Sequence, residues 1–229
     1  MAKRKSAKRT GGRGWKYLLW PFRIALAIVL PFVVLIRVSV FCYAALEWNH
    51  WLALFVGAAL TFLLIFFYLT RISRLIWGKK KADRRGPVGS LRISLVIVGG
   101  FCLYALLYLS AGNAKTASVA DEYTSTHPLL RLAVSTLTIF DRDLVITDMS
   151  RSHADYDDMG LSRKRNSLHY PQADGYVHAI DLRTRDRAEW RNSALQWYFE
   201  LMGFGTLRHV GTGDHLHVSL LIRENPAAR

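Results

Sequence analysis

The sequence Gly213-Asp214-His215-Leu216-His217-Val218-Ser219 decides the fold of the C-terminal half of this chain. Successive side chains of a β-strand point to opposite faces, so His215 and His217 share one face while Leu216 and Val218 share the other. The stretch therefore predicts a strand with one polar face, able to bind a metal, and one core face. Two histidines also occur on ordinary solvated hairpins, so the rest of the chain must decide between these interpretations.

The elements around this strand predict a compact α+β domain with a small antiparallel sheet. Residues 206–210 and 215–222 form a predicted hairpin across Gly211-Thr212-Gly213. Upstream, the patterns predict a helix beginning at Pro128, a strand at 144–147, a long loop at 153–175 and a strand at 176–182. A further helix carries Trp190 and Trp197 at helical spacing and ends at Gly203. We interpret the two tryptophans as core residues.

Three apolar runs precede this domain, at Ile24–Leu46, Trp51–Thr70 and Leu91–Ser110. Each contains about 20 residues, the length that a helix needs to cross the hydrocarbon core of a bilayer. The runs mostly lack the polar face of a soluble core helix, so they predict three transmembrane helices. Arg37 lies within the first run, and we expect its side chain to extend toward the outer membrane surface.

The net charge of +14 comes from the segments that flank the apolar runs. Residues 1–23 carry eight Lys or Arg and no acid, and residues 71–92 carry eight against Asp83 alone. From Gly112 onward there are fourteen basic and fifteen acidic residues, which argues against nucleic-acid binding by the folded domain. Because basic loops remain cytoplasmic, residues 1–23 and 71–90 are expected inside and the C-terminal domain outside.

These patterns divide the chain into five parts. We expect a basic cytoplasmic tail at 1–23, a membrane region at 24–111 with helices at about 24–46, 51–70 and 91–110, and a basic cytoplasmic loop at 71–90. A polar stalk at 112–127 then leads to the extracytoplasmic domain at 128–229. Cys42 and Cys102 both lie in predicted membrane helices, so cysteine-based zinc motifs are excluded from the domain, and any metal there needs His and carboxylate ligands.

Three stretches of the domain resemble the zinc D-alanyl-D-alanine carboxypeptidase family, the M15-type peptidases that include phage endolysins and share a fold with the Hedgehog signalling domain. They are Ser150-Arg151-Ser152, then Asn166-Ser167-Leu168-His169 followed by Val177-His178-Ala179-Ile180-Asp181-Leu182, and finally Asp214-His215-Leu216-His217. The resemblance covers roughly residues 128–222. It implies the Hedgehog/DD-peptidase-like fold for the domain.

The resemblance also implies a Zn²⁺ site with named ligands. His169, Asp181 and His217 would hold the zinc, Asp214 would be the catalytic base, and Arg151 would bind substrate or the developing oxyanion. Two imidazoles and one carboxylate leave a zinc ion with an open position for water, as catalytic sites require. Zinc lowers the pKa of that water toward about 7, and a nearby carboxylate can accept its proton.

The spacing of the first two ligands leaves alternatives open. Eleven residues separate His169 from Asp181, more than the family pattern has, and we interpret Pro171–Gly175 as an insertion in the connecting loop. His178 is the rival ligand, although on a strand it would face away from Asp181. An alignment without a gap would place Asp174 at the histidine position. His215 is assigned a substrate-contacting or supporting role.

The expected function is that of a membrane-anchored zinc metallopeptidase that hydrolyses peptidoglycan stem peptides, either as a D-alanyl-D-alanine carboxypeptidase or as a related endopeptidase. The expected location is the cytoplasmic (inner) membrane, multi-pass, with the N-terminus inside and the catalytic domain in the periplasmic or extracellular space. The partners would be the lipid bilayer and the peptidoglycan peptide. The alternative is a noncatalytic cell-wall-binding or signalling module that retains the M15-like fold.

Overall fold

The computed structural model describes residues 20–158, 160, 162, 166–211 and 213–220, with the backbone alone for residues 79–86, 153 and 158. Most of the predicted basic tail and the end of the last predicted strand lie outside these residues. The elements, in chain order, are α2 (Trp20–Ala44), α3 (His50–Trp77), α4 (Lys79–Leu107), η1 (Ala111–Asn113), α5 (Ala117–Asp121), η2 (Glu122–Ser125), α6 (Pro128–Phe140), β1 (Ile146–Asp148), α7 (His153–Asp158), β2 (Ala179–Arg183), α8 (Glu189–Met202), β3 (Gly205–His209) and β4 (His215–Ser219).

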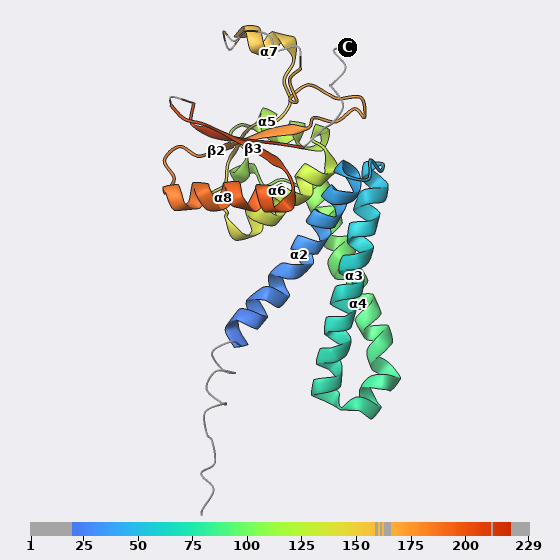
Figure 1. The fold of residues 1–229 in the computed structure, drawn as a ribbon. Helices are drawn as coiled ribbons and strands as arrows, with labels where there is room; N and C mark the ends of the chain where they lie inside the picture. Colours follow the sequence, from blue (N-terminus) through green and yellow to red (C-terminus); the bar gives the residue numbers. More distant parts are fainter. Residues whose placement is uncertain (1–19, 159, 161, 163–165, 212, 221–229) are drawn as a thin grey trace, which may run out of the picture.

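Three helices are long and apolar enough to cross a membrane, as the apolar runs predict: α2, α3 and residues 87–107 of α4. Figure 1 shows these three long helices below a smaller domain that holds the sheet. The helices α3 and α4 run side by side, whereas α2 diverges from them toward its N-terminus. The chain therefore has the character of a membrane protein with a folded domain at one end of its long helices.

The basic segment 71–90 is helical rather than a loop. Helix α3 continues to Trp77 and α4 begins at Lys79, so Gly78 alone forms the break between them. Gly78 has a φ of 73°, a conformation that glycine adopts without a steric penalty. Lys, Arg and Leu are good helix formers, and their presence around the turn explains why the helices extend beyond the apolar runs.

The sheet has four strands in the order β1-β2-β4-β3, and all neighbouring pairs are antiparallel. This result confirms the predicted small antiparallel sheet and the hairpin between β3 and β4. In the register between β2 and β4, Asp181 lies opposite His217 and Ile180 lies opposite Val218. Polar residues of one strand therefore lie opposite polar residues of the other, and their side chains share one face of the sheet.

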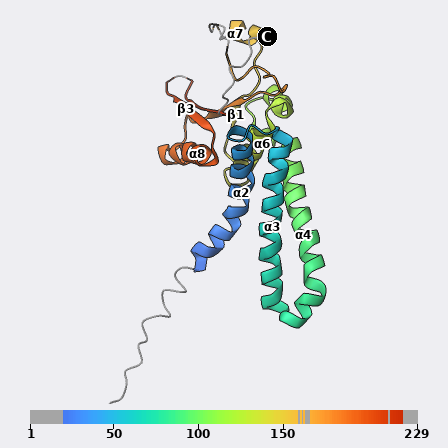
Figure 2. The ribbon, with the colours of Figure 1, turned by 45° about the vertical axis from the view of Figure 1, so that its right-hand side comes forward.

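The other face of the sheet packs on helices α6 and α8. Ile180 and Val218 belong to the same buried core as Leu130 of α6 and Phe199 of α8. The helix predicted from Pro128 and the helix predicted to end at Gly203 are both confirmed, and Gly203 is in the left-handed conformation with a φ of 96°. Figure 2 shows α6 and α8 between the strands and the long helices, so the polar face is directed away from those helices.

The predicted stalk at 112–127 is wrong, because this segment packs into the domain. It forms η1, α5 and η2, and Tyr123 is buried with its hydroxyl donating to the carbonyl of Ala105 in α4. Leu35 and Ile36 of α2 and Ala105 of α4 belong to the same hydrophobic core as the sheet. The long helices and the sheet domain therefore share one core.

The prediction that Trp190 and Trp197 are core residues is also wrong. Both lie on the side of α8 opposite its buried residues, with exposed fractions of 74% and 71%. The residues of α8 that enter the core are instead Asn192, Leu195, Phe199 and Met202. Helical spacing alone does not tell which of two apolar faces of a helix meets the core.

The close packing of α2 on α3 depends on Gly57, and substitution there gives a first prediction. A Cβ atom at Gly57 would lie 2.1 Å from Oγ of Ser39 and 2.6 Å from the carbonyl oxygen of Leu35. We expect Gly57→Val to force the two helices apart and to lower the free energy of unfolding by about 1–3 kcal/mol. The thermal midpoint of the full-length protein in detergent would measure this loss. Gly100→Val, which meets open space, is the matched control, and an equal effect of both would contradict the prediction.

Candidate metal centre

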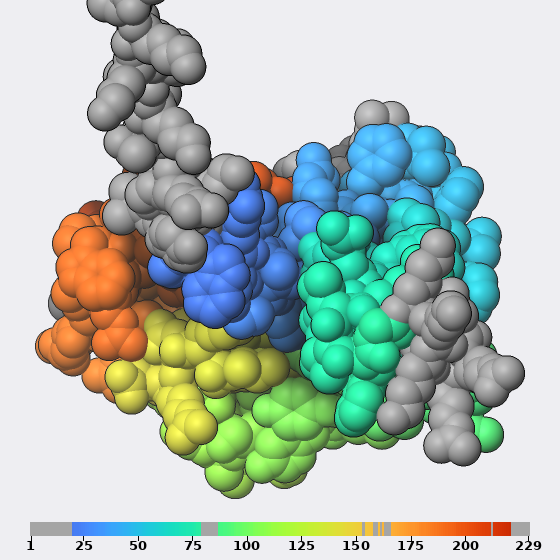
Figure 3. All heavy atoms as spheres, turned by 90° about the horizontal axis from the view of Figure 1, so that it is seen from below, coloured from blue at the N-terminus to red at the C-terminus, as the bar shows by residue number. Residues whose placement is uncertain are grey.

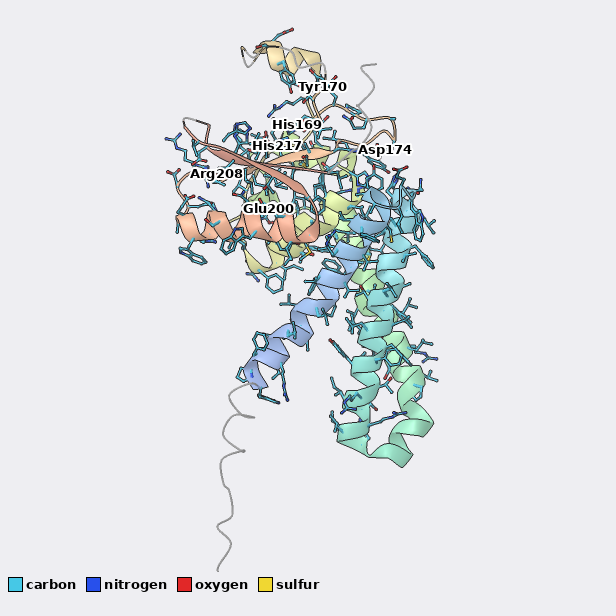
Figure 4. All side chains as sticks on the ribbon, viewed as in Figure 1. His169, Tyr170, Asp174, Glu200, Arg208 and His217 are labelled. Carbon is cyan, nitrogen blue, oxygen red and sulfur yellow. The ribbon has the colours of Figure 1, made fainter. Side chains whose placement is uncertain are left out.

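The side chains of His169, Asp181 and His217 converge on one point at the polar face of the sheet. Nε2 of His169 lies 3.3 Å from Nδ1 of His217 and 3.4 Å from Oδ1 of Asp181, and the third distance, between Nδ1 of His217 and Oδ1 of Asp181, is 2.8 Å. Figure 4 shows His169 and His217 side by side above the sheet. Ligands of a tetrahedral zinc ion with bonds of about 2.0–2.1 Å are separated by about 3.3 Å, so the three atoms have the spacing of a metal site.

Strand register and a closed loop place these residues together. Asp181 and His217 are opposite each other on β2 and β4. His169 comes from a loop that folds back on itself, since Pro171 forms a β-bridge with Val177 and the amide of His178 donates to the carbonyl of Leu168. The residues between His169 and Asp181 therefore form a closed loop that returns to its starting point. This closure agrees with the interpretation of residues 171–175 as an insertion.

The hydrogen bonds of His169 leave the correct nitrogen for a metal. Nδ1 of His169 is 2.7 Å from the carbonyl oxygen of Met149, so this nitrogen carries the proton and donates. Nε2, the ring nitrogen that remains for a metal, faces Nδ1 of His217 and a carboxylate oxygen. A single proton on His217 can satisfy only one of these contacts, whereas a cation satisfies all three. The carbonyl that fixes the proton on Nδ1 is the kind of supporting contact typical of metal-bound histidines.

Arg151 and Asp148 support the carboxylate of Asp181. The guanidinium of Arg151 donates to Oδ2 of Asp181 at 2.7 Å and also to Asp148. Burial raises the pKa of Asp181, but the imidazoles of His169 and His217 outweigh burial and hold that pKa far below its usual range. Asp181 is therefore ionised, as a metal ligand must be. Arg151 reaches the predicted site, but its guanidinium is occupied by two carboxylates.

Asp214, the residue that the resemblance assigns as base, is held in an ion pair. Its carboxylate accepts from Nε of Arg208 at 2.7 Å, from Nη2 of Arg208 at 2.9 Å and from the hydroxyl of Thr184 at 2.6 Å. The Arg208 guanidinium, together with the Thr184 hydroxyl, lowers the pKa of Asp214 to about 2. A carboxylate so stabilised is a weak proton acceptor. The assignment of Asp214 as base stays a prediction.

His215 directs its Nε2 toward the same site. Nδ1 of His215 lies 2.5 Å from the carbonyl oxygen of Gly213 and donates to it, which leaves Nε2 as an acceptor. That nitrogen is 3.7 Å from Oδ2 of Asp181. The ring of His209, the cross-strand neighbour, stacks on His215 with ring centres 4.7 Å apart. His215 is therefore a second candidate for the base.

The two alternative ligands lie elsewhere. His178 is buried, and its Nε2 is 3.0 Å from both carboxylate oxygens of Asp174. Asp174 groups with His50 and His127, away from the group of His169, and His178 packs on His127 with ring centres 4.8 Å apart. The expectation that His178 faces away from Asp181 agrees with this arrangement. Figure 4 shows Asp174 well separated from His169 and His217.

A pocket of about 430 Å³ opens beside Asp181, and several of its residues are absent from the sequence predictions. Arg151, Asp181, Asp214 and His215 line it together with Lys115, Thr147, Asp148, Arg183, Arg185 and Gly213. Arg183 and Arg185 follow Asp181 at alternate positions, so the strand pattern itself could have placed them on the polar face. Lys115 could not be found in this way, because it comes from the segment expected to be a stalk.

The contact of Arg151 with Asp181 leads to a second prediction. We expect Arg151→Gln to weaken zinc binding by the protein about 10–100-fold, because loss of a partner that orients a metal ligand typically has an effect of this size. Competition with a chromophoric chelator would measure the affinity. Arg183→Gln, at an exposed arginine of the same pocket that pairs with Asp186, is the matched control. Equal affinities of the two variants would contradict the prediction.

Comparison with known proteins adds no relative to this picture. The chain matches no protein-family model, no curated protein and no solved structure.

Proposed function

We propose that the protein is a membrane-anchored, zinc-dependent peptidase that hydrolyses peptidoglycan stem peptides, with a DD-peptidase-like domain on the outer side of the cytoplasmic membrane. The convergence of His169, Asp181 and His217 beside an open pocket carries the proposal. The charge distribution supports the orientation, since the basic residues 71–92 surround the Gly78 turn at the end of the long helices that is remote from the domain.

The three ligands suit a catalytic rather than a purely structural metal. Their donor set is two imidazoles and one carboxylate, and Asp181 lines a pocket open to solvent. Zinc bound there would lower the pKa of a water molecule and polarise a peptide carbonyl. The chain's own contribution is to hold Asp181 with Arg151, to fix the proton of His169 on Nδ1 and to provide a base near the pocket.

His215 is the base that the geometry favours. Its Nε2 makes no contact with Gly213 and lies near Asp181, and His215 lines the pocket, whereas the oxygens of Asp214 accept three hydrogen bonds. An imidazole can accept a proton near neutral pH, which a carboxylate with a pKa of about 2 does poorly. Asp214 then has a different role, which is to hold Arg208 and Thr184 beside the turn that carries His215.

A pair of variants distinguishes the two candidate bases. We expect His215→Gln to lower kcat for peptide hydrolysis about 10²–10⁴-fold, the usual contribution of a positioned acid or base, with zinc content unchanged. Asp214→Asn should lower kcat by less than about tenfold, because the amide keeps part of the contact with Arg208. Steady-state kinetics with parallel metal analysis would measure both effects. The reverse order of the two losses would assign the base to Asp214.

The charges of the pocket fit a peptide with a free carboxylate. Lys115, Arg183 and Arg185 line it, and arginine forms bidentate hydrogen bonds with carboxylates. A stem peptide ending in D-alanine offers such a group next to its last peptide bond. This feature supports a carboxypeptidase-like reaction.

The direct test uses the full-length protein in detergent or in a bilayer, because the long helices and the domain share one core. Incubation with a stem pentapeptide that ends in two D-alanines should release D-alanine. A chelator should stop the release, and added Zn²⁺ should restore it. A metal-loaded protein that binds peptidoglycan but releases no amino acid and no shortened peptide would instead support the noncatalytic wall-binding alternative.

A further inference from the structure

A second group of metal-binding side chains lies where the long helices meet the sheet domain. We propose that His50, His127 and Asp174, together with His178, form a separate site for a late first-row divalent cation, zinc above all. None of these residues belongs to the candidate metal centre of His169, Asp181 and His217. Four separate observations support the second site.

The first observation is geometric. Three imidazoles surround Oδ2 of Asp174: Nε2 of His178 at 3.0 Å, Nε2 of His127 at 3.6 Å and Nδ1 of His50 at 3.8 Å. The potential ligand atoms of His50, His127 and Asp174 all lie within 4.8 Å of one another. Separations of about 3.3 Å are typical of tetrahedral zinc ligands, so small side-chain movements bring the nitrogens and the carboxylate to bonding distance.

The second observation concerns buried nitrogen atoms. His127 has an exposed fraction of 0%, and its Nε2 has no hydrogen-bond partner among the residues that the structure describes. Buried polar atoms of native proteins are normally paired, so an unpaired nitrogen aimed at a carboxylate 3.6 Å away indicates a missing ligand. Binding through Nε2 moves the proton to Nδ1 and removes the hydrogen bond from the Leu129 amide. That bond is long at 3.3 Å, and the metal bond must offset the loss of this acceptor by the Leu129 amide.

The third observation is the charge of the cluster. Burial raises the pKa of Asp174, but the contacts with His178, the Tyr176 amide and His127 together outweigh burial and lower that pKa. Burial lowers the pKa of His127 well below its usual value, which keeps this ring neutral. The ion-pair partners of Asp174 among the described residues are all histidines. The carboxylate and the surrounding imidazoles provide the oxygen and nitrogen donor atoms that zinc accepts.

The fourth observation is that the ligands come from three separate parts of the chain. His50 begins α3, His127 is the N-cap residue of α6, and Asp174 with His178 belongs to the loop that leads into β2. The ring of Tyr176 packs against both His50 and His127. A cation here joins a membrane helix to the loop that also positions His169. Its role is to hold the domain on the long helices.

The test removes two ligands of the candidate metal centre and measures how much metal the protein still binds. Full-length protein with His169→Ala and His217→Ala is loaded with Co²⁺, whose visible absorption is intense when its ligands are tetrahedral. We expect one bound Co²⁺ per chain, a tetrahedral spectrum and a rise in the thermal midpoint. Adding Asp174→Asn should abolish all three signals, while Asp186→Asn, at an exposed carboxylate, should leave them unchanged.

The outcomes are distinct from those that test the peptidase. Helix content by circular dichroism shows whether the Asp174→Asn protein is folded, and His50→Ala gives a second, milder removal of one ligand. Absence of Co²⁺ binding in the folded double variant would overturn the second site, as would binding that is indifferent to both Asp174→Asn and His50→Ala. Neither result bears on hydrolysis, which the wild-type protein reports separately.

An independent observation on α8 carries a second inference. We infer that the exposed apolar stripe of α8, formed by Trp190, Ala194, Trp197 and Leu201, lies in the surface of the lipid bilayer. These four residues recur at the spacing of one helix face, on the side opposite the buried residues of α8. A large exposed apolar face marks an interaction site, and tryptophan is enriched where membranes meet water.

The position of α8 relative to the long helices selects lipid as the partner. Figures 1 and 2 show α8 lying crosswise to these helices, on the side of the domain from which they extend. Figure 3 shows α8 (orange) and the segment after α6 (yellow) next to α2 (blue) on the underside. Phe140, the last residue of α6, is exposed, and its ring centre is 6.0 Å from that of Phe32 in α2. An amphipathic helix in this orientation matches the geometry of interfacial helices, whose apolar faces are buried about 5–10 Å deep.

The contact of α8 with Arg37 indicates the level of α8 relative to the membrane surface. A Cβ atom at Gly203, just after α8, would lie 2.6 Å from Nη1 of Arg37, so the C-terminal end of α8 is level with Arg37 on α2. Ala44, the last residue of α2, comes seven positions after Arg37, which is about 10 Å of helix. A charged side chain at that level belongs at the membrane surface, and the carbonyl groups at the C-terminus of α8 favour a cation there.

The experiment measures lipid contact at single positions. In full-length protein with Cys42→Ser and Cys102→Ser, an environment-sensitive fluorophore is attached to Trp197→Cys or, as control, to Val210→Cys on the hairpin, where the native residue is 80% exposed. In nanodiscs of phosphatidylcholine and phosphatidylglycerol, lipids with a nitroxide near the headgroup should quench position 197 severalfold more than position 210. Equal quenching would overturn the inference. So would protection of position 197 that depends on protein concentration, which would assign the stripe to a second copy of the chain.

Discussion

His217→Ala is expected to remove one metal ion per chain and to lower hydrolysis of stem peptides by a factor on the order of 10³ or more. His217 provides Nδ1, which is 2.8 Å from Oδ1 of Asp181 and 3.3 Å from Nε2 of His169. Without it only two ligands remain, and the site loses both its geometry and its charge balance. Elemental analysis and D-alanine release by the full-length protein would measure the two losses.

The control for this variant is Leu207→Ala. Leu207 lies opposite His217 on β3 and is exposed, so its removal changes the same part of the hairpin without removing a donor atom. Its metal content and activity should remain near those of the wild type. An active His217→Ala protein with a full complement of metal would refute the assignment of the ligands, and inactivity of both variants would point to general damage of the hairpin.

Phe199→Ala is expected to lower the free energy of unfolding by about 3–5 kcal/mol. Phe199 is completely buried, and its ring packs edge to face on Phe204 at a centroid distance of 5.8 Å. Truncation removes apolar contact area and leaves a cavity between α8 and the sheet, because the surrounding strands can relax only in part. Urea unfolding of the full-length protein in detergent, followed by tryptophan fluorescence, would measure the loss.

Trp197→Ala is the control for Phe199→Ala. Trp197→Ala removes a larger side chain only two residues away, but this side chain is exposed, so the free energy of unfolding in detergent should change by less than about 0.5 kcal/mol. A large destabilisation by Trp197→Ala together with a small one by Phe199→Ala would show that the core face of α8 has been assigned the wrong way round.

Local patterns predict much of the sheet and part of the candidate site. The alternation in residues 213–219 places His217 and Leu216 on opposite faces, and the register with β2 puts Asp181 directly opposite His217. The apolar runs predict the three long helices because their length and composition leave few other structures. These successes share one cause, which is that periodicity and length are properties of a single segment.

The features that sequence reasoning missed depend on contacts between segments. The loop after His169 is closed by a β-bridge between Pro171 and Val177. No local sequence pattern predicts this bridge. The small polar residues at 112–127 are typical of a linker, yet Tyr123 anchors this segment to α4. The face of α8 that carries Trp197 has the same spacing as a core face, and only the position of the neighbouring helices distinguishes the two.

The core shared by α2, α4 and the sheet constrains how the protein can be processed. Leu35, Ile36 and Ala105 are buried against the domain, so a cut in the segment that joins α4 to α6 would expose apolar surface on both fragments. Proteolytic shedding, which releases many membrane-tethered enzymes as active soluble forms, would here yield an unstable fragment. The folded domain is therefore expected to remain intact only while it is joined to its membrane helices.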